Sequence, residues 1–349
     1  MSELPEIFET YRTFLEDEIK SIISDLELFK ISKNKTTIYD MMAYHLGWAN
    51  ENGDKIQLSS GKYLRATLAL LACDSVCDEF RIALPVAAAI ELIHNFSLVH
   101  DDIQDDDEIR RHRPTVWKIW GKPQAINVGS AMQALSTLAV LKLSNTKIPP
   151  GKLLEVLKIL NGSCIKMIEG QYLDIDFEDR TDITVENYLE MIERKTAALI
   201  QCSLQIGAVL TLDSDKIKPF KNFGKYMGIS FQTRDDILGM WGNDQKTGKP
   251  CGNDLKKKKK SLPVVYMLSH GDINLKREFL NIFTKDNTSD NDICKIMEIF
   301  EKIKAKQFCE QMNQHYYELA TNEILNLPIK EGKLKHYREI ADFLIKREF

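Results

Sequence analysis

Apolar residues recur at helical spacing along almost the whole chain, and this periodicity restricts the fold more than any other feature of the sequence. Near the N-terminus, Ile7, Tyr11, Leu15 and Ile19 follow one another at intervals of four residues, which places them on one face of a helix. No segment shows a convincing alternation of period two, the pattern typical of a half-buried strand. The sequence therefore predicts an all-α protein.

The segment from residue 83 to residue 100 is apolar nearly all round. A helix without a polar face has to be covered on every side, which predicts a central helix of a large bundle. The chain has 349 residues, 44% of them hydrophobic, and can bury a sizeable core. Since no linker rich in Pro, Gly or Ser divides it, we expect a single domain over residues 1–349.

Composition restricts the partners and the compartment. A net charge of −4 argues against binding to nucleic acid, because phosphate backbones select basic surfaces. The seven cysteines are scattered and lack paired metal-ligand spacing, as in a reduced cytoplasmic protein. The acidic, amphipathic N-terminus resembles neither a signal nor a transit peptide, and no apolar run is expected to span a membrane. We therefore expect a soluble, cytoplasmic protein.

A run of aspartates follows the apolar segment directly, in the stretch DDIQDDDEIRR. On a helix, Asp101 and Asp105 lie on the same face, about 6 Å apart along the axis, with Asp102 beside them. Mg²⁺ takes a few carboxylates together with phosphate oxygens, and Arg110 and Arg111 offer forked donors to phosphate. An exposed acidic helix face is the alternative for such a run by itself, but the apolar segment before it and the arginines after it favour diphosphate chemistry.

A second pair, Asp235 and Asp236, follows another apolar helical run, with Gln232 one turn earlier. One such pair is a weak signal. Two pairs, each closing an apolar helix of an all-helical protein, indicate helices that clamp a metal-bound diphosphate. Gly224 and Gly228 in the same run would allow close helix packing, although such glycines are common by chance.

These motifs give the chain a resemblance to a known family. It resembles the trans-isoprenyl diphosphate synthases, and most of all the geranylgeranyl and farnesyl diphosphate synthases. The elements that carry the resemblance occur in the order of that family: GKYLR (61–65), DDIQD with RR (101–111), GQYLD (170–174), KT (195–196), and FQTRDD (231–236) followed by GKP and GNDLKKKKKSLP (252–263). Each element is common by itself, but the ordered set is specific.

The resemblance implies an all-α bundle around a central tunnel, usually a homodimer, that condenses isopentenyl diphosphate with an allylic diphosphate. It also implies three Mg²⁺ ions in each active site, bridged by the allylic diphosphate. Two of the ions would be held by Asp101, Asp102 and Asp105, and the third by Asp235 and Asp236.

The resemblance further implies the substrate-binding residues. The allylic diphosphate would contact Arg110, Lys195, Lys249 and Lys259. The diphosphate of isopentenyl diphosphate would contact Lys62, Arg65, His94 and Arg111. Thr196, Gln232 and Gln171 would line the place where positive charge develops, with support from Asp174. The catalytic set would be Lys195, Thr196 and Gln232 with Asp101 and Asp102, and the loop from Gly242 to Lys260 would close over the diphosphate.

The sequence departs from the family pattern at Gly239, where many members have a third aspartate in the second cluster. Asn243 and Ser130 also replace more common aspartates. Because the first two aspartates of that motif bind metal in the family, we expect an active enzyme with a weaker third Mg²⁺ site.

The expected product has twenty carbons. Phe96 lies five residues before Asp101 and is followed by the small Ser97, an arrangement that resembles the geranylgeranyl-forming members of the family. The alternatives are a farnesyl diphosphate synthase, a class I terpene cyclase and a non-catalytic partner subunit. A cyclase has no need of a second diphosphate pocket, and a partner subunit is expected to lose its metal-binding aspartates.

Overall fold

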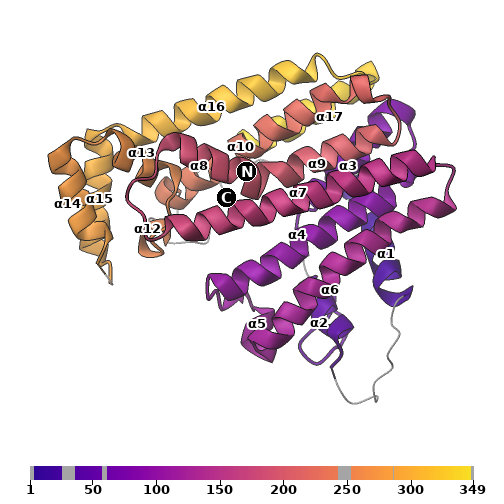
Figure 1. Ribbon diagram of the computed structural model, residues 1–349, viewed down its shortest axis with the longest axis horizontal. Coiled ribbons are helices and arrows are strands. Elements are labelled where there is room, and N and C mark those ends of the chain that lie inside the picture. The colour runs from indigo at the N-terminus through magenta and orange to yellow at the C-terminus, as the bar shows by residue number, and fades with distance from the viewer. Residues whose placement is uncertain (1–3, 26–35, 57–60, 243–252, 286, 347–349) are drawn as a thin grey trace. The chain divides into compact units, whose positions relative to one another are not determined.

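The computed structural model describes residues 4–25, 36–56, 61–242, 253–285 and 287–346. These residues are helical apart from their connections and one short hairpin (Figure 1), so the prediction of an all-α protein is confirmed. Several of the helices begin where the sequence offers a capping side chain. Thr37, Thr184 and Ser289, for example, each form a reciprocal capping box with the residue three positions later.

The chain forms two compact units. The N-terminal unit comprises Glu6–Asn161 and Ser203–Ile217, and the C-terminal unit comprises Met1–Pro5, Gly162–Cys202 and Lys218–Phe349. Two helices, α7 (Pro150–Phe177) and α9 (Ala198–Val209), supply residues to both units. The expectation of one domain over residues 1–349 stays a prediction.

The N-terminal unit is built around α4 (Leu84–Gln104), which packs against α6, α3 and α1. The predicted central helix is confirmed, because the side chains of Ala87, Ala88 and Ala89 are all fully buried. The other elements of this unit are α1 (Glu6–Asp25), α2 (Ile38–His45), α3 (Leu64–Cys77), α5 (Val116–Trp120), α6 (Lys122–Leu141) and a hairpin of β1 (Ile109–Arg110) with β2 (Arg113–Pro114).

Two helical segments of this unit correct the prediction about membrane spans. Phe80–Gln104 and Lys122–Asn145 are long and apolar enough to cross a bilayer by length and composition. However, 67% and 44% of their most apolar stretches are buried inside the protein. The core helix of a soluble protein passes the same test, because it is covered by neighbouring helices instead of lipid.

The C-terminal unit is built around α10 (Lys218–Trp241), which packs against α16, α17 and α13. Its other helices are α8 (Val185–Ile192), α12 (Asn253–Lys256), α13 (Leu262–His270), α14 (Ile273–Phe283), α15 (Asp290–Lys302), α16 (Ala305–Ile324) and α17 (Leu334–Lys346).

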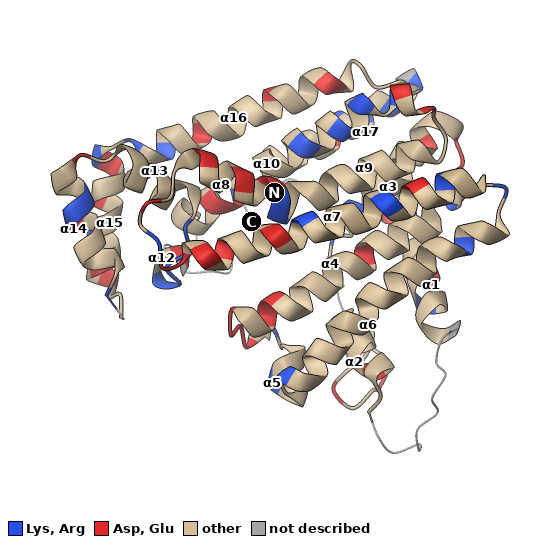
Figure 2. Ribbon diagram, in the orientation of Figure 1, with Lys and Arg blue, Asp and Glu red and all other residues tan. Residues whose placement is uncertain are grey.

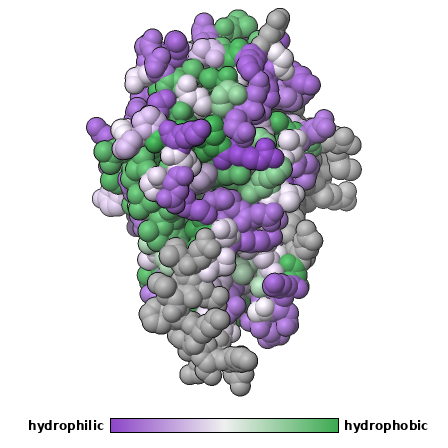
Figure 3. All heavy atoms as spheres, turned by 90° about the vertical axis from the view of Figure 1, so that its right-hand side faces the viewer, coloured by the Kyte–Doolittle hydropathy of each residue, from purple (hydrophilic) through white to green (hydrophobic). Residues whose placement is uncertain are grey.

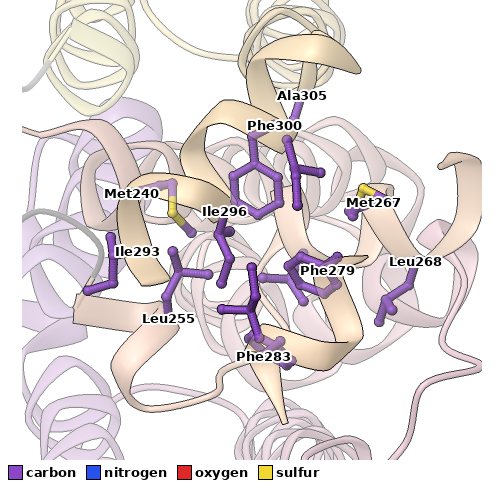
Figure 4. Close-up of a cluster of buried hydrophobic side chains, with 13 residues drawn as sticks. Met240, Leu255, Met267, Leu268, Phe279, Phe283, Ile293, Ile296, Phe300 and Ala305 are labelled. Carbon is purple, nitrogen blue, oxygen red and sulfur yellow. The ribbon is translucent and has the colours of Figure 1, made fainter. Parts of the chain in front are cut away.

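A hydrophobic cluster fixes α12 within this unit (Figure 4). Leu255 of α12 and Met240 of α10 are fully buried, together with Phe279 and Ile296 from α14 and α15. The rings of Phe279 and Phe283 stack with centroids 4.9 Å apart. Because α12 carries the start of the lysine run, this cluster holds that run beside the end of α10.

Exposed apolar side chains are frequent on α6 and α7. Those exposed over at least two fifths of their surface are Ile126, Leu138, Leu141, Leu154, Ile165, Ile168, Tyr172 and Ile175. On the face shown in Figure 3, hydrophobic patches likewise alternate with hydrophilic ones. Single apolar residues are normal on a surface, but a row along one helix marks a candidate contact with a partner.

Candidate active site

The first aspartate cluster lies at the C-terminal end of α4, where the ribbon in Figure 2 is acidic. Asp101 and Asp105 are partly exposed, whereas Asp102 is only 1% exposed. Asp102 Oδ1 accepts a hydrogen bond from Arg110 Nε at 2.7 Å. Burial raises the pKa of Asp102 to about 6, although the charge of Arg110 opposes this shift.

The surroundings of the other Asp102 oxygen, Oδ2, indicate whether this cluster suits a cation. Among the described residues, no group donates a hydrogen bond to the buried Asp102 Oδ2. A buried carboxylate oxygen without a donor is costly, and a hard divalent cation satisfies it. In the described part of the chain, no three His, Cys, Asp or Glu side chains lie close enough together to hold a metal ion by themselves. The partly exposed carboxylates therefore suit Mg²⁺ that takes further oxygens from a bound phosphate.

A strained hairpin turn brings Arg110 and Arg111 to this cluster. The turn residues Arg111 and His112 have φ angles of +51° and +62°, as a two-residue type I′ turn requires. Asparagine or glycine normally occupies such positions, and other residues cost about 1 kcal/mol or more. Side chains kept under strain point to a function, and here Arg110 pairs with Asp102 while the Arg111 guanidinium packs against Gly61.

The residues predicted to hold the second diphosphate come from α4, the hairpin and the start of α3. Arg65 Nη1 lies 3.4 Å from His94 Nε2, and a Cβ placed on Gly61 would lie 2.9 Å from Arg111 Nη2. Lys62 follows Gly61 directly and is exposed. Burial, with the charges of Arg65 and Arg111, holds the pKa of His94 well below its ordinary value. The structure therefore brings these predicted residues together within the N-terminal unit.

Sequence reasoning missed the polar residues buried behind this group. Glu91 and Asn95 of α4 are 2% and 0% exposed. Burial, followed by the charges of Arg111 and Arg110, lowers the pKa of His45 to about 3. The sequence feature that could have revealed Glu91 and Asn95 is the presence of an acid and an amide, on either side of His94, inside an otherwise apolar helical run.

The second aspartate pair is held by neutral donors. Asp236 is 6% exposed, and its Oδ2 accepts hydrogen bonds from Tyr188 Oη and Leu262 N, both at 2.7 Å. Its Oδ1 accepts from Gln232 Nε2 at 3.0 Å. Burial, with the nearby charge of Asp254, raises the pKa of Asp236 to about 7. Asp235 is partly exposed and faces a cavity.

This cavity of about 300 Å³ collects most of the residues predicted in the C-terminal unit. Its lining includes Asp174, Lys195, Gln232, Asp235, Asp236 and Lys259, which the sequence predicted, and Tyr188, Asp254 and Lys260, which it did not. Lys195 forms an ion pair with Asp174, and Thr196 Oγ1 donates to Gln232 Oε1 at 2.8 Å. Gln171 is not among the lining residues.

The predicted pair Lys195 and Thr196 lies in a π-helical turn, Glu193–Ala197, between α8 and α9. Glycines pack against this turn from two helices. A Cβ placed on Gly170 of α7 would lie 2.1 Å from Lys195 N, and one on Gly228 of α10 would lie 2.4 Å from Ala197 Cα. Only glycine fits at either position, so the close packing of Gly228 has a definite role. π-helical turns are rare and are often found at functional sites.

Gly239, where the family pattern has an aspartate, lies beside a carboxylate from another helix. A Cβ placed on Gly239 would lie 2.3 Å from Asp254 Oδ2. Asp254 therefore occupies the space that a side chain at position 239 would fill. The weaker third Mg²⁺ site expected from Gly239 stays a prediction.

The lysine run contains one buried member. Lys260 is 5% exposed and donates through Nζ to the carbonyl oxygen of Glu178 at 2.6 Å. Burial lowers the pKa of Lys260. Lys256 is exposed and pairs with Asp290. Lys249 and the rest of residues 243–252 lie outside the described residues, so their predicted role stays a prediction.

The predicted chain-length residues lie one turn before the first cluster. Phe96 is 4% exposed, and its ring meets the His100 ring edge to face at 5.7 Å. The His100 ring in turn packs on Gly129 of α6, where a Cβ would lie 2.4 Å from Nε2. Ser97 is partly exposed and donates to the carbonyl oxygen of His94 at 2.8 Å. Phe96 is therefore held firmly against its neighbours.

Comparisons with known proteins agree with this arrangement. The family described as Polyprenyl synthetase matches residues 47–300. A geranylgeranyl diphosphate synthase of Mycobacterium tuberculosis is 40% identical over 240 residues, covering 68% of this chain and 67% of that protein. A (2E,6E)-farnesyl diphosphate synthase of the same species is 32% identical over 314 residues, covering 88% and 86%.

A solved structure extends the likeness to the fold. The crystal structure of a polyprenyl synthetase from Streptomyces coelicolor superimposes with a TM-score of 0.87 at 30% sequence identity, covering 98% of this chain and all of that one. The all-α isoprenoid synthase fold implied by the sequence motifs is thereby confirmed. Since both a geranylgeranyl and a farnesyl synthase are among the relatives, the likeness leaves the product open.

Proposed function

The chain belongs to the polyprenyl synthetase family, and we propose that it is a prenyltransferase that condenses isopentenyl diphosphate with an allylic diphosphate. The observation that carries this proposal is the pair of cations Arg65 and Arg111, with the His94 imidazole next to Arg65, beside the Asp102–Arg110 pair. One acidic site and one cationic site within a single unit suit two diphosphate substrates.

The first step breaks the bond between the allylic carbon and its diphosphate oxygen. Bound Mg²⁺, three ions in each active site, would stabilise the charge of the departing diphosphate. Asp101, Asp102 and Asp105 would hold two of the ions, and Asp235 and Asp236 the third. Arg110, Lys195 and Lys259 would bind the departing oxygens with charge-assisted hydrogen bonds, which strengthen as negative charge develops.

The allylic cation that remains has to be protected from water until it is captured. Thr196 and Gln232 are bonded to each other, and Gln232 is bonded to Asp236, so their dipoles are fixed before the reaction. The double bond of isopentenyl diphosphate then attacks the cation, and a proton is lost to the released diphosphate. No side-chain base is required.

Product length is the finer part of the proposal, and we propose geranylgeranyl diphosphate. Phe96 would form the floor that stops the growing chain, because its ring is buried and supported by His100. Phe96→Ala would open that floor and lengthen the product. An unchanged product length in this variant would show that Phe96 is not the floor. A wild-type product of fifteen carbons would favour the farnesyl alternative.

The alternatives explain less of the structure. A class I terpene cyclase uses one diphosphate and gives no reason for the second cationic group around Arg65. A non-catalytic partner subunit gives no reason for a buried Asp102 oxygen to which none of the described residues donates. We further propose a cytoplasmic homodimer, for which the exposed apolar residues of α6 and α7 offer a contact surface.

The test is an incubation of purified protein with Mg²⁺, labelled isopentenyl diphosphate and each short allylic diphosphate in turn, followed by dephosphorylation and chain-length analysis. Geranylgeraniol supports the whole proposal, and farnesol supports the reaction but not the product. Hydrocarbon formed without consumption of isopentenyl diphosphate indicates a cyclase. No turnover with any allylic substrate indicates the partner subunit.

A further inference from the structure

Glu91 is a buried acid that the reaction itself does not use. It lies on α4, three residues before His94 and four before Asn95, so all three share one face of the helix. The Glu91 side chain is almost completely buried. An acid at such a position is rare unless it is paired with a positive charge.

Asn95 fixes one end of this carboxylate. Asn95 Nδ2 donates to Glu91 Oε1 at 2.9 Å and to the Glu91 carbonyl oxygen at 2.8 Å. In the part of the chain that the structure describes, no group donates a hydrogen bond to Glu91 Oε2. The amide therefore sets the orientation of the carboxylate and leaves its second oxygen available to neighbouring cations.

Two of the residues assigned to isopentenyl diphosphate, Arg65 and Arg111, act electrostatically on Glu91. Burial raises the pKa of Glu91, and the charges of Arg65 and Arg111 oppose that shift. Arg65 lies beside His94, and Arg111 packs on Gly61 next to Lys62. Glu91 is more deeply buried than any of these groups, so a bound diphosphate meets the cations before it meets the carboxylate.

Two electrostatic effects of Glu91 oppose each other. Its charge weakens the positive potential at the site, which disfavours an anion. Without that charge, however, no buried carboxylate attracts Arg65 and Arg111, and their guanidinium groups would turn away from the site. Because the carboxylate is fixed by Asn95 and lies behind the guanidinium groups, we expect its ordering effect to exceed its repulsion of the substrate.

We propose that Glu91, held by Asn95, is a positioning residue that keeps the guanidinium groups of Arg65 and Arg111 in place for the diphosphate of isopentenyl diphosphate. The inference rests on the proposed function, since it takes the identity of that substrate from it. It assigns Glu91 no contact with the substrate and no part in the chemical step.

The experiment compares Glu91→Gln with the wild-type enzyme. Glutamine keeps the size of the side chain and the acceptor for Asn95, and removes only the charge. We expect the KM for isopentenyl diphosphate to rise about tenfold, as for the loss of one charge-assisted contact, while the KM for the allylic diphosphate stays within about twofold. Calorimetric titration of isopentenyl diphosphate by itself should show the same weakening. Glu51→Gln, the same charge change at an exposed position of this unit, should alter neither constant.

Two further variants separate positioning from a general structural role. Glu91→Asp restores the charge and should recover part of the affinity. Asn95→Ala keeps the charge but releases the carboxylate, and should raise the same KM about threefold. Asn95→Ala also serves as the test if Glu91→Gln does not fold, and an unchanged KM in it then overturns the proposal.

The outcomes distinguish this inference from the function on which it rests. If the wild-type protein neither consumes nor binds isopentenyl diphosphate, the proposed function and the inference both fail. If the wild-type enzyme turns over but Glu91→Gln leaves its KM unchanged or lowers it, the inference fails and the function stands. An equal rise in both KM values would mean a general structural role and would also overturn it.

Discussion

The two aspartate pairs have similar sequences but different surroundings. Asp102 in the N-terminal unit is held by an opposite charge, Arg110, and keeps one buried oxygen without a donor among the described residues. Asp236 in the C-terminal unit is held by a hydroxyl, a backbone N–H and a side-chain amide, which together bond both of its oxygens. The first carboxylate is prepared for a cation, and the second is already satisfied.

This difference gives the buried aspartates of the two pairs different roles. In the C-terminal unit, Asp236 acts as an anchor that fixes the end of α10, so that the partly exposed Asp235 faces the cavity. The N-terminal site is assembled mainly by charges, among them Arg65, Glu91 and Arg111. The cavity of the C-terminal unit is assembled mainly by hydrogen bonds and by glycine contacts at the π-helical turn. The two regions should therefore respond to different perturbations.

The largest effect is expected from Asp102→Asn. This change removes the charge that binds Arg110 and that would bind metal, and kcat should fall about 1,000-fold, equivalent to about 4 kcal/mol of transition-state stabilisation. Steady-state kinetics at saturating Mg²⁺ measures it. Asp106→Asn is the matched control, because the Asp106 side chain is 71% exposed and pairs with Lys122. A similar loss in both variants would contradict the assignment of Asp102.

Gly228→Ala should break the packing of the C-terminal site. The added Cβ would lie 2.4 Å from Ala197 Cα, so α10 has to move away from the π-helical turn. We expect a loss of about 1–3 kcal/mol in the free energy of unfolding, with a fall in kcat as the Thr196–Gln232 contact lengthens. Denaturant unfolding and kinetics measure the two effects.

Gly162→Ala is the control for this substitution. Nothing lies within 4 Å of a Cβ at Gly162, in the middle of α7. Alanine there should stabilise the protein by about 0.5–1 kcal/mol through its higher helix propensity. If both variants lose stability equally, helix packing at Gly228 is not the cause.

Tyr188→Phe should weaken the anchor of the second pair. The change removes one of the donors to Asp236 Oδ2 and leaves the ring in place, so the free energy of unfolding should fall by about 1–2 kcal/mol. We expect kcat to fall by about tenfold or less, because Leu262 N and Gln232 still hold the carboxylate. Thermal unfolding combined with kinetics tests this, and wild-type values for both would show that Asp236 does not need the hydroxyl.

The smallest effect concerns the pH dependence of stability in the N-terminal unit. The pKa of His45 is about 3 in the folded protein, against about 6.5 in an unfolded chain. Between these values the unfolded state binds the proton and the folded state does not. His45 therefore contributes stability above pH 6.5, and this contribution is lost as pH falls, by at most about 1.4 kcal/mol per pH unit. The slope of the unfolding free energy against pH reports the protons taken up on unfolding. Between pH 6.5 and 5, His45→Gln should reduce this uptake by up to one proton. An unchanged slope would rule out His45 as its source.

Much of the N-terminal site could be predicted because its residues are close in sequence or belong to marked motifs. The Asp102–Arg110 pair joins residues eight positions apart across a helix end and a hairpin. Glu91 and Asn95 were not predicted, because a role cannot be assigned to a buried acid in an apolar helix until its cationic neighbours in space are known. The hairpin itself was also missed, because its two strands have only two residues each and lack the usual turn glycine.

Less of the C-terminal site could be predicted, because its support comes from distant segments. Tyr188 lies 48 residues before Asp236, and Leu262 lies 26 residues after it. Neither belongs to a charged motif. The role of Gly228 depends on the distance between two helices, which no periodicity reveals.

The sequence by itself determined that the chain is helical, that one helix is buried and ends in carboxylates, and which charged residues accompany them, because these properties follow from local spacing and hydrophobicity. The tertiary structure decided which carboxylates are already satisfied, which lysine of the run is buried and which glycines are indispensable. Those outcomes depend on desolvation and on contacts between segments far apart in the chain, and both exist only after the helices have packed.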